Sequence, residues 1–467
     1  MKRILAFTVI VVVIISMVSV FSFTGCKKET AETTAAQTEV TTEETSAETT
    51  AAETTAGAES ITLKLVWSNE GDTPGGGKWF AEMAEKFNQE NPNITVEVAE
   101  HTLDQLMPSW QAAVEAQLGV DIQFFWGGVW NLEDVWAGNL EDITTLIPEE
   151  EWQHWTNKDD VSFQGRPWIA PWFNFALPAM VYNKELFKQA GLDPEKPPKT
   201  WDEFLADCEA LKKAGITGFA FGLKDAWGAE PVWSMLGPAT IDNINEIKLA
   251  ATQEGAFLTD KHKDWLVKLY ELYTKGYLLE EIMSVDYIPG RDLFFDGTVG
   301  FGQIASNRLD DVEKMSGGGV ANFMPIPVFG PGKLSGKENT QTQSFGIPTF
   351  SQHKKEAADF IMFMHRPENL TRLYEMTNVF PSDDRFDASV LSTVIEKDYW
   401  KYYSVDPVPY FGVYAPTMVI GEGIYIAAQM VCSGNTPDEA AAYIEEIAAK
   451  WREMNPKMIE NFQNWAK

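Results

Sequence analysis

Several tryptophans lie where a predicted strand or helix ends, next to short polar side chains. The chain has 17 tryptophans, and the sequence DIQFFWGGVWNLEDVW at 121–136 places three of them around a Gly-Gly pair. The flat faces of sugar rings stack on aromatic rings, while their hydroxyl rims need carboxylate or amide partners. Any single tryptophan is as often a core residue as a ligand contact. The repeated pairing of tryptophan with polar residues in several loops favours ligand binding for the set. The loop pairings are Trp67 with Asn69 and Glu70, Trp172 with Asn174, and Trp227 with Asp225.

The Gly-Gly pair forms a predicted elbow between a strand and a helix. Gly127 and its neighbour can adopt backbone conformations closed to other residues and let a ligand approach the main chain. Trp126 and Trp130 bracket the pair, so we predict that both face a ligand. Asn131 is predicted to cap the following helix, LEDVWAGNL. Trp136 lies on the core-facing side of that helix, so we predict that it serves packing.

No motif for a metal, a nucleotide or a covalent nucleophile is present in the sequence. The three cysteines have no CxxC spacing, and the five histidines show no HExxH pair. The sequence VGFGQIA at 299–305 contains G-x-G-x-x-A, but SNRLDD follows where a dinucleotide site needs a long helix. We therefore expect that the protein binds no cofactor and no metal ion and that it is not an enzyme. A glycosidase, which needs two facing carboxylates, stays open as an alternative because the chain is rich in Asp and Glu.

The charge balance is strongly acidic. The 37 Lys and Arg residues against 68 Asp and Glu residues give a formal net charge of −31. Such a chain repels phosphate backbones, so we expect no nucleic-acid partner. The balance suits a neutral or cationic ligand, and a receptor for a peptide or a polyamine stays open beside a receptor for a sugar.

The amino terminus has the features of an export signal. Lys2 and Arg3 precede an apolar run at Ile4–Phe23, and the sequence FTGC then ends at Cys26. This arrangement resembles the signal of a bacterial lipoprotein, in which Cys26 is lipidated; an uncleaved membrane anchor is the alternative. The Thr-, Ala- and Glu-rich stretch that follows cannot bury enough apolar surface to fold, so we expect a solvated tether over 26–60.

The rest of the chain alternates strand and helix patterns. Ile61–Trp67 and Ile94–Glu100 alternate apolar and polar residues as strands do, and residues 121–126 form a third predicted strand. Helix patterns follow the first two strands. This order predicts βαβ units, a mostly parallel sheet, and a ligand crevice beyond the carboxyl ends of the strands. Proline-rich extended stretches at 168–183 and 322–332 suit crossings between two lobes.

Two longer motifs resemble a known family. VYNKELFKQAGLDPEKPPKTWDEFLADCEALKKAGITGFAFG at Val181–Gly222 and CSGNTPDEAAAYIEEIAAKW at Cys432–Trp451 are similar to sequences in the extracellular solute-binding proteins of bacterial ABC importers, in their sugar-binding branch. Thr200 and Thr436 are predicted to cap the helices of these motifs, so both motifs belong to the scaffold. The resemblance implies an α/β, periplasmic-binding-protein-like fold with two discontinuous lobes, joined by hinges around a ligand cleft.

The resemblance also implies a function and partners. The protein would capture a saccharide, which we expect to be an oligosaccharide, by hinge closure and deliver it to the membrane permease of an importer. It would be an extracytoplasmic monomer, anchored to the cell membrane through lipid on Cys26. The second lobe would add Gln303, Tyr410, Tyr414 and Glu422 as ligand contacts. The expected division is a signal peptide at 1–25, a tether at 26–60, one lobe at 61–172 and 325–380, and the other at 173–324 and 381–467.

Overall fold

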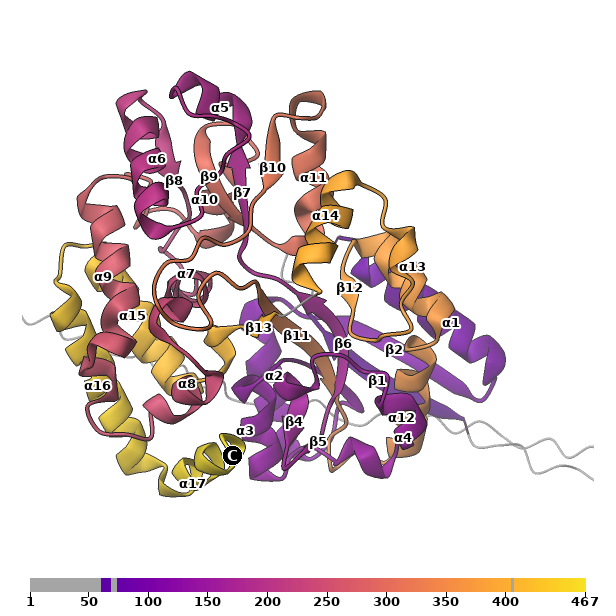
Figure 1. The fold of residues 1–467 in the computed structure, drawn as a ribbon. Coiled ribbons are helices and arrows are strands. Elements are labelled where there is room, and N and C mark those ends of the chain that lie inside the picture. The colour runs from indigo at the N-terminus through magenta and orange to yellow at the C-terminus, as the bar shows by residue number, and fades with distance from the viewer. Residues whose placement is uncertain (1–59, 69–73, 405–406) are drawn as a thin grey trace, which may run out of the picture. The chain divides into compact units, whose positions relative to one another are not determined.

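The computed structural model describes residues 60–68, 74–404 and 407–467 (Figure 1). Contacts between Cα atoms divide the chain into residues 1–57 and residues 58–467, and the fold below is that of the second unit. The predicted signal peptide and nearly all of the predicted tether lie outside the described residues. Within the described part, no helix is both long and apolar enough to cross a bilayer.

Strands and helices alternate along most of the second unit. The strands are β1 (Ile61–Trp67), β2 (Ile94–Glu100), β3 (Ile122–Trp126), β4 (Ser162–Phe163), β5 (Arg166–Pro167), β6 (Ala170–Phe175), β7 (Ala179–Asn183), β8 (Thr217–Phe219), β9 (Val299–Ile304), β10 (Ala321–Phe323), β11 (Asn339–Gly346), β12 (Phe380–Pro381) and β13 (Val408–Pro409). The α-helices are α1 (Gly76–Glu90), α2 (Leu103–Ala116), α3 (Val129–Ala137), α4 (Glu149–Trp152), α5 (Lys184–Gln189), α6 (Trp201–Lys213), α7 (Ala229–Leu236), α8 (Ile244–Ala250), α9 (Asp260–Thr274), α10 (Tyr287–Asp292), α11 (Leu309–Lys314), α12 (Lys354–Met364), α13 (Pro367–Thr377), α14 (Val394–Tyr403), α15 (Tyr425–Val431), α16 (Pro437–Met454) and α17 (Pro456–Trp465).

The first sheet has seven strands in the order β12-β6-β11-β3-β1-β2, with β13 paired to β11. β1 runs parallel to β2 and β3, whereas β11 is antiparallel to both β3 and β6. The prediction of a mostly parallel sheet is therefore wrong for this sheet. β6 leads the chain into the second sheet and β11 brings it back, so the two strands must run in opposite directions.

The second sheet has four strands in the order β10-β7-β9-β8, and Figure 1 shows it apart from the strands of the first sheet. The extended stretch at 168–183 holds two strands, β6 in the first sheet and β7 in the second, separated by residues 176–178. A second crossing, at 324–338, joins β10 to β11. The chain thus passes between the two sheets more than once rather than completing one sheet before the other.

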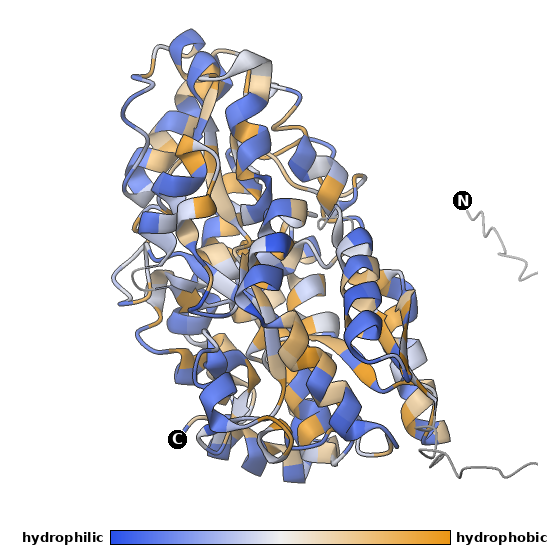
Figure 2. Ribbon diagram, turned by 90° about the vertical axis from the view of Figure 1, so that its right-hand side faces the viewer, coloured by the Kyte–Doolittle hydropathy of each residue, from blue (hydrophilic) through white to orange (hydrophobic). Residues whose placement is uncertain are grey.

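Local signals in the sequence set most of the element boundaries. β1 and β2 have the predicted bounds, and in β1 alternate residues Leu63, Leu65 and Trp67 are buried. The predicted helix caps are confirmed, because the side chains of Thr200 and Thr436 each accept a hydrogen bond from the backbone N–H three residues on. Figure 2 shows hydrophilic and hydrophobic stretches alternating along many helices, as amphipathic helices require.

The predicted cap at Asn131 is wrong. Helix α3 begins at Val129, and Gly128 is its N-cap residue at a φ of 65°. Because this glycine turns the chain sharply, only Gly127 and Gly128 separate the strand-end Trp126 from the first residue of the helix. Asn131 is buried in the first turn, where its Nδ2 donates to the Trp126 carbonyl at 3.1 Å.

An aromatic core fills the space between α1 and the first sheet. Trp67 and Trp172 are only 1% and 2% exposed. The Trp67 ring lies 4.9 Å from Phe80, and the Trp172 ring stacks on Trp79 with centroids 5.7 Å apart. Trp67 and Trp172 meet edge to face at 6.2 Å. Such burial of large rings supplies much of the hydrophobic stabilisation of a sheet-and-helix layer.

The carboxy-terminal helix α17 packs its aromatic residues against α3. Trp136 lies 5.1 Å from Phe462, 6.0 Å from Trp465 and 5.7 Å from Phe163, measured between ring centroids. The prediction that Trp136 serves packing is therefore confirmed. Trp465 in turn stacks on Tyr414 at 4.9 Å with nearly parallel rings, so α17 ties α3 to the segment around Tyr414.

A buried carboxylate lies behind this aromatic stack. The Asp160 side chain accepts hydrogen bonds from the Tyr414 hydroxyl and, at 2.9 Å, from the Thr342 backbone N–H. Burial raises the pKa of Asp160 to about 6, against the opposing effect of these two hydrogen bonds. Nearby, Lys248 places its Nζ 4.4 Å from the Trp465 ring centroid, and burial lowers the pKa of this lysine to about 8.

Replacing Trp136 by alanine is expected to lower the free energy of unfolding by about 3 kcal/mol, because three ring contacts are lost and a cavity is left. Urea unfolding followed by tryptophan fluorescence or circular dichroism measures this change. Trp152→Ala, in the short helix α4 and partly exposed, is the matched control. Equal losses in the two variants would contradict the packing role of Trp136.

The stability contribution of Asp160 is expected to depend on pH. Its folded pKa of about 6 lies above the ordinary aspartate pKa of 3.8, so between these values the folded protein holds a proton that the unfolded chain releases. Stability from this group is therefore present below about pH 4 and lost as the pH rises through about 6. Urea unfolding over this range should show the wild-type advantage over Asp160→Asn shrinking as the pH rises; a constant or growing advantage would count against this pKa.

Candidate ligand-binding site

Three cavities adjoin one another along helix α2. The central cavity, of about 370 Å³, shares Met107 and Trp130 with the side cavity of about 410 Å³. On its other side it shares Leu103, Asp104 and Trp227 with the acidic cavity of about 730 Å³. Because neighbouring cavities share lining residues, together they offer one long groove to an extended ligand.

The central cavity is lined mainly by aromatic and aliphatic side chains. The rings of Trp126 and Trp130 meet edge to face, 5.5 Å apart, and Trp227 packs edge to face on Tyr287 at 4.5 Å. The lining comes from both ends of the sequence, through α2, β3, α3, the β6–β7 crossing, α7, β11 and α15. The lining residues are Leu103, Asp104, Met107, Trp126, Trp130, Leu177, Trp227, Glu230, Gln341, Tyr410 and Tyr425.

Polar groups of the central cavity are placed among the rings. The Tyr425 hydroxyl donates a hydrogen bond to the Glu230 carboxylate. Burial, together with the nearby Glu230 charge, raises the pKa of both Tyr410 and Tyr425 well above the usual range. Both phenols therefore stay protonated, and with Gln341 and Asp104 they offer the donors and acceptors that a hydroxyl-rich ligand needs.

The Gly-Gly elbow presents Trp126 and Trp130 because protein atoms crowd its backbone. The Gly127 N–H donates to the Thr342 carbonyl at 2.7 Å, and the Gly128 N–H donates to the Asp160 carbonyl at 2.6 Å. A Cβ on Gly127 would lie 2.8 Å from Asp160 Cβ, and one on Gly128 would lie 2.1 Å from the Val413 carbonyl oxygen. The glycines thus permit close packing of three chain segments, and Gly127 itself is buried and does not line the three cavities.

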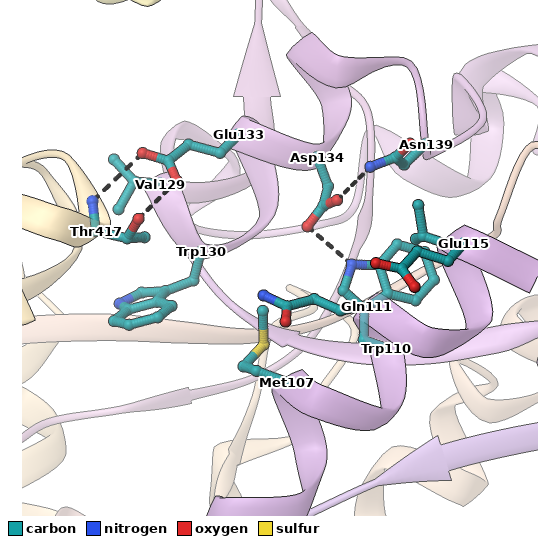
Figure 3. Close-up of a pocket in the computed structure, with 11 residues that line it drawn as sticks. Met107, Trp110, Gln111, Glu115, Val129, Trp130, Glu133, Asp134, Asn139 and Thr417 are labelled. Carbon is teal, nitrogen blue, oxygen red and sulfur yellow. Dashed lines mark hydrogen bonds between the residues drawn. The ribbon is translucent and has the colours of Figure 1, made fainter. Parts of the chain in front are cut away.

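The side cavity has two carboxylates that are occupied by protein donors (Figure 3). Glu133 accepts hydrogen bonds from the Thr417 N–H at 3.3 Å and the Thr417 hydroxyl at 2.7 Å. Asp134 accepts from Trp110 Nε1 at 2.9 Å and from Asn139 Nδ2 at 2.6 Å. Burial raises the pKa of both carboxyls above their ordinary values. These acids link α3 to its neighbours, so this cavity offers a ligand less free polar surface.

The structure brings five of the predicted site residues together at the groove. Trp126, Trp130, Trp227 and Tyr410 line the central cavity, and Asp225 lines the acidic cavity next to Trp227. Trp126, Trp130 and Trp227 are partly exposed, as a stacking surface requires, whereas Tyr410 is 2% exposed.

The other described residues of the predicted site lie away from the three cavities. Trp67 and Trp172 belong to the aromatic core, and Tyr414 is held by Asp160 and Trp465. The Asn174 side chain bonds to Thr156, Thr342 and Ser382, Gln303 is fully buried in β9, and Glu422 is exposed. Asn69, Glu70 and Cys26 lie outside the described residues.

Sequence reasoning missed several lining residues. Glu230 and Tyr425 lie inside α7 and α15, where nothing in the local pattern separates a cavity-facing position from a core position. Leu103 carried a usable signal, because this large apolar residue starts the helix that directly follows the predicted strand β2. Its position beyond a strand end is where an α/β sheet binds ligands.

The sequence matches the family model described as bacterial extracellular solute-binding protein over residues 70–370. The uncharacterized ABC transporter extracellular-binding protein PH1039 of Pyrococcus horikoshii is 32% identical over 321 residues, which cover 66% of this chain and 69% of that protein. The sn-glycerol-3-phosphate-binding periplasmic protein UgpB of Escherichia coli is 30% identical over 369 residues, which cover 70% of this chain and 75% of that protein. UgpB of Yersinia pestis is 29% identical over 206 residues, 38% of this chain, and the match spans 44% of that relative's length.

Solved structures share the fold at low sequence identity. A chitin oligosaccharide binding protein has a TM-score of 0.73 and 20% identity, over 84% of this chain and 99% of the other. A protein described with xylan utilization by Caldanaerobius polysaccharolyticus has a TM-score of 0.71 and 19% identity, over 83% of this chain and 99% of that protein. These likenesses confirm the predicted α/β, periplasmic-binding-protein-like fold. Because the family match covers well over half of the chain, this protein belongs to the bacterial extracellular solute-binding protein family.

Proposed function

We propose that this protein captures an oligosaccharide in the groove along α2 and delivers it to the permease of an ABC importer. The observation that carries the proposal is the lining of the central cavity, where five aromatic side chains surround Asp104, Glu230 and Gln341. Flat rings suit the apolar faces of sugars, and carboxylates and amides suit their hydroxyls. A groove of adjoining cavities suits several sugar units better than one.

The charge of the groove favours a sugar over a phosphate ester. Relatives of this chain are named as sn-glycerol-3-phosphate-binding proteins. A phosphate site needs positive charge from arginine, lysine or a helix amino terminus to balance the anion. The amino terminus of α2 borders the acidic cavity, but it carries the Asp104 carboxylate. Among the described residues that line the central and acidic cavities, none is lysine or arginine, and five are aspartate or glutamate. Those carboxylates would repel a phosphate group.

We propose that the chain forms two lobes, 61–172 with 325–380 and 173–324 with 381–467, that close on the ligand. β6 and β12 of the first sheet cross these boundaries, and β13, within the second range, pairs with β11 of the first sheet. Support comes from the crossings at 176–178 and 324–338 and from the origin of the lining. Trp126 ends β3 of the first sheet and Trp130 lies in the helix that follows, whereas Trp227 and Glu230 come after β8 of the second sheet. A ligand that contacts both sets stabilises the closed form over the open one.

The remaining expectations on location and partners belong to the same proposal. We propose cleavage of the signal before Cys26, lipidation of that cysteine and a solvated tether over 26–60, which would hold a monomeric receptor outside the membrane beside its permease. Binding would occur without turnover and without a cofactor.

Isothermal calorimetry with a panel of mono- and oligosaccharides tests the proposal. We expect heat of binding with oligosaccharides, and about tenfold weaker binding in Trp126→Ala or Trp227→Ala because a stacking surface is lost. Trp152→Ala, which removes a partly exposed tryptophan outside the groove, should leave affinity unchanged.

Three outcomes would overturn the proposed function. Binding of sn-glycerol-3-phosphate without binding of any saccharide would identify a phosphate-ester receptor. Binding of peptides or polyamines that is indifferent to Trp126→Ala and Trp227→Ala would identify a non-sugar receptor. Release of product from chromogenic glycosides, lost on replacement of a single carboxylate, would identify a glycosidase.

A further inference from the structure

The acidic cavity extends the groove beyond the aromatic rings of the central cavity. It is formed where β2 leads into α2 and by the loops that precede α7 and α10. It shares Trp227 and Asp104 with the central cavity. A ligand stacked on Trp227 would therefore reach the acidic cavity with its next substituent or sugar unit.

Carboxylates dominate the charge of this cavity. Asp104, Asp225 and Asp286 line it, and none of its described lining residues is lysine or arginine. Lys224 approaches from outside the lining, with its Nζ 3.2 Å from an Asp286 oxygen. Both members of this ion pair are about half exposed, and such exposed pairs contribute little. Lys224 offsets at most the charge of Asp286, so Asp104 and Asp225 leave the cavity with an excess of negative charge.

Two of the carboxylates already repel each other. Both oxygens of Asp225 lie 3.1–3.2 Å from the Tyr287 backbone N–H, which fixes the carboxylate beside Asp286. Burial raises the pKa of Asp225, and the Asp286 charge raises it further. A cation bound between them would offset this repulsion. Its attraction to the two carboxylates would strengthen as the closing lobes exclude water.

A buried hydroxyl in the same cavity has no hydrogen-bond partner among the described residues. Ser68 follows β1, is 4% exposed, and lines the cavity with its Oγ unsatisfied. A buried hydroxyl without a partner is costly, so it points to a group that the bound molecule supplies. This observation does not depend on the acidic residues. It indicates a bound molecule with hydrogen-bonding groups, whereas the carboxylates alone would attract any dissolved cation.

We propose that the acidic cavity binds a protonated amine carried by the saccharide whose rings stack in the central cavity. This inference rests on the proposed function and narrows its substrate class to amino-bearing oligosaccharides. An ammonium group donates three hydrogen bonds, which suits several carboxylates and the Ser68 hydroxyl. The edge of the cavity at Trp227 adds an aromatic face to which a cation is attracted.

An amine fits the cavity better than a metal ion. Within the described residues, no group of three or more His, Cys, Asp or Glu side chains is arranged to hold a metal. His101, the other titratable residue in the lining, has its Nδ1 2.9 Å from Ser109 Oγ. The carboxylates are thus spread along the cavity wall, as suits a molecule of several atoms.

Calorimetry at low salt and mildly acidic pH tests this inference with three trisaccharides of one linkage: β-1,4-linked glucose, glucosamine and N-acetylglucosamine. We expect the glucosamine trisaccharide to bind about tenfold more tightly than the glucose trisaccharide, with the gap narrowing as salt is raised. Asp104→Asn and Asp225→Asn should each narrow the gap about threefold, because each removes one of the charges that attract the amine.

The chain offers a matched control for the first variant. Asp202 is exposed and occupies the same second position of a threonine-capped helix, in α6, as Asp104 does in α2. Asp202→Asn removes the same charge from a helix amino terminus away from the groove, so the glucosamine preference should persist. Equal effects of Asp104→Asn and Asp202→Asn would overturn the inference.

The outcomes separate this inference from the proposed function. Binding of all three trisaccharides with no preference for the amine would overturn the amine site and leave saccharide capture intact. Absence of binding by every saccharide would overturn both. Spermidine binding more tightly than the glucosamine trisaccharide, with no dependence on Trp126, would show that the amine site serves a polyamine and would overturn the saccharide assignment.

Discussion

The buried carboxylate of Asp160 joins the chain segments that shape the groove. The Asp160 side chain accepts hydrogen bonds from the Tyr414 hydroxyl and from a backbone N–H of β11. The Asp160 backbone carbonyl accepts hydrogen bonds from the Gly128 N–H and from the Asn131 side chain. These bonds hold the Gly-Gly elbow between β3 and α3 in a position that only glycine permits. Because the elbow is held from behind, Trp126 and Trp130 project into the central cavity as a preorganised surface.

The groove presents two kinds of surface along its length. Aromatic rings dominate the central cavity, and carboxylates dominate the adjoining acidic cavity. Stacking is tolerant of sugar identity, whereas charge discriminates strongly between a neutral, a cationic and an anionic ligand. For the saccharide ligand that we propose, this division would place general affinity in one half of the groove and selectivity in the other.

Burial separates the tryptophans that face the groove from those that stabilise the fold. Trp67 and Trp126 both end strands of the first sheet and both precede polar or glycine-rich loops. Helix α1 covers Trp67, which is 1% exposed, whereas Trp126 stays partly exposed beside α2. The same local pattern thus led to two different environments. Whether a strand-end tryptophan faces the groove or the core depends on which helix lies over that strand end.

The order of strands and helices, the helix caps and the family motifs follow from short-range rules, because periodicity and capping act within a few residues. The sequence by itself therefore determined the α/β class, the bounds of β1 and β2, and the capped ends of α6 and α16. Tertiary structure alone decided that β11 returns antiparallel, that Gln303 and Tyr414 are buried, and that Glu230 and Tyr425 meet in the cavity. These outcomes depend on contacts between residues more than a hundred positions apart, and no local pattern carries that information.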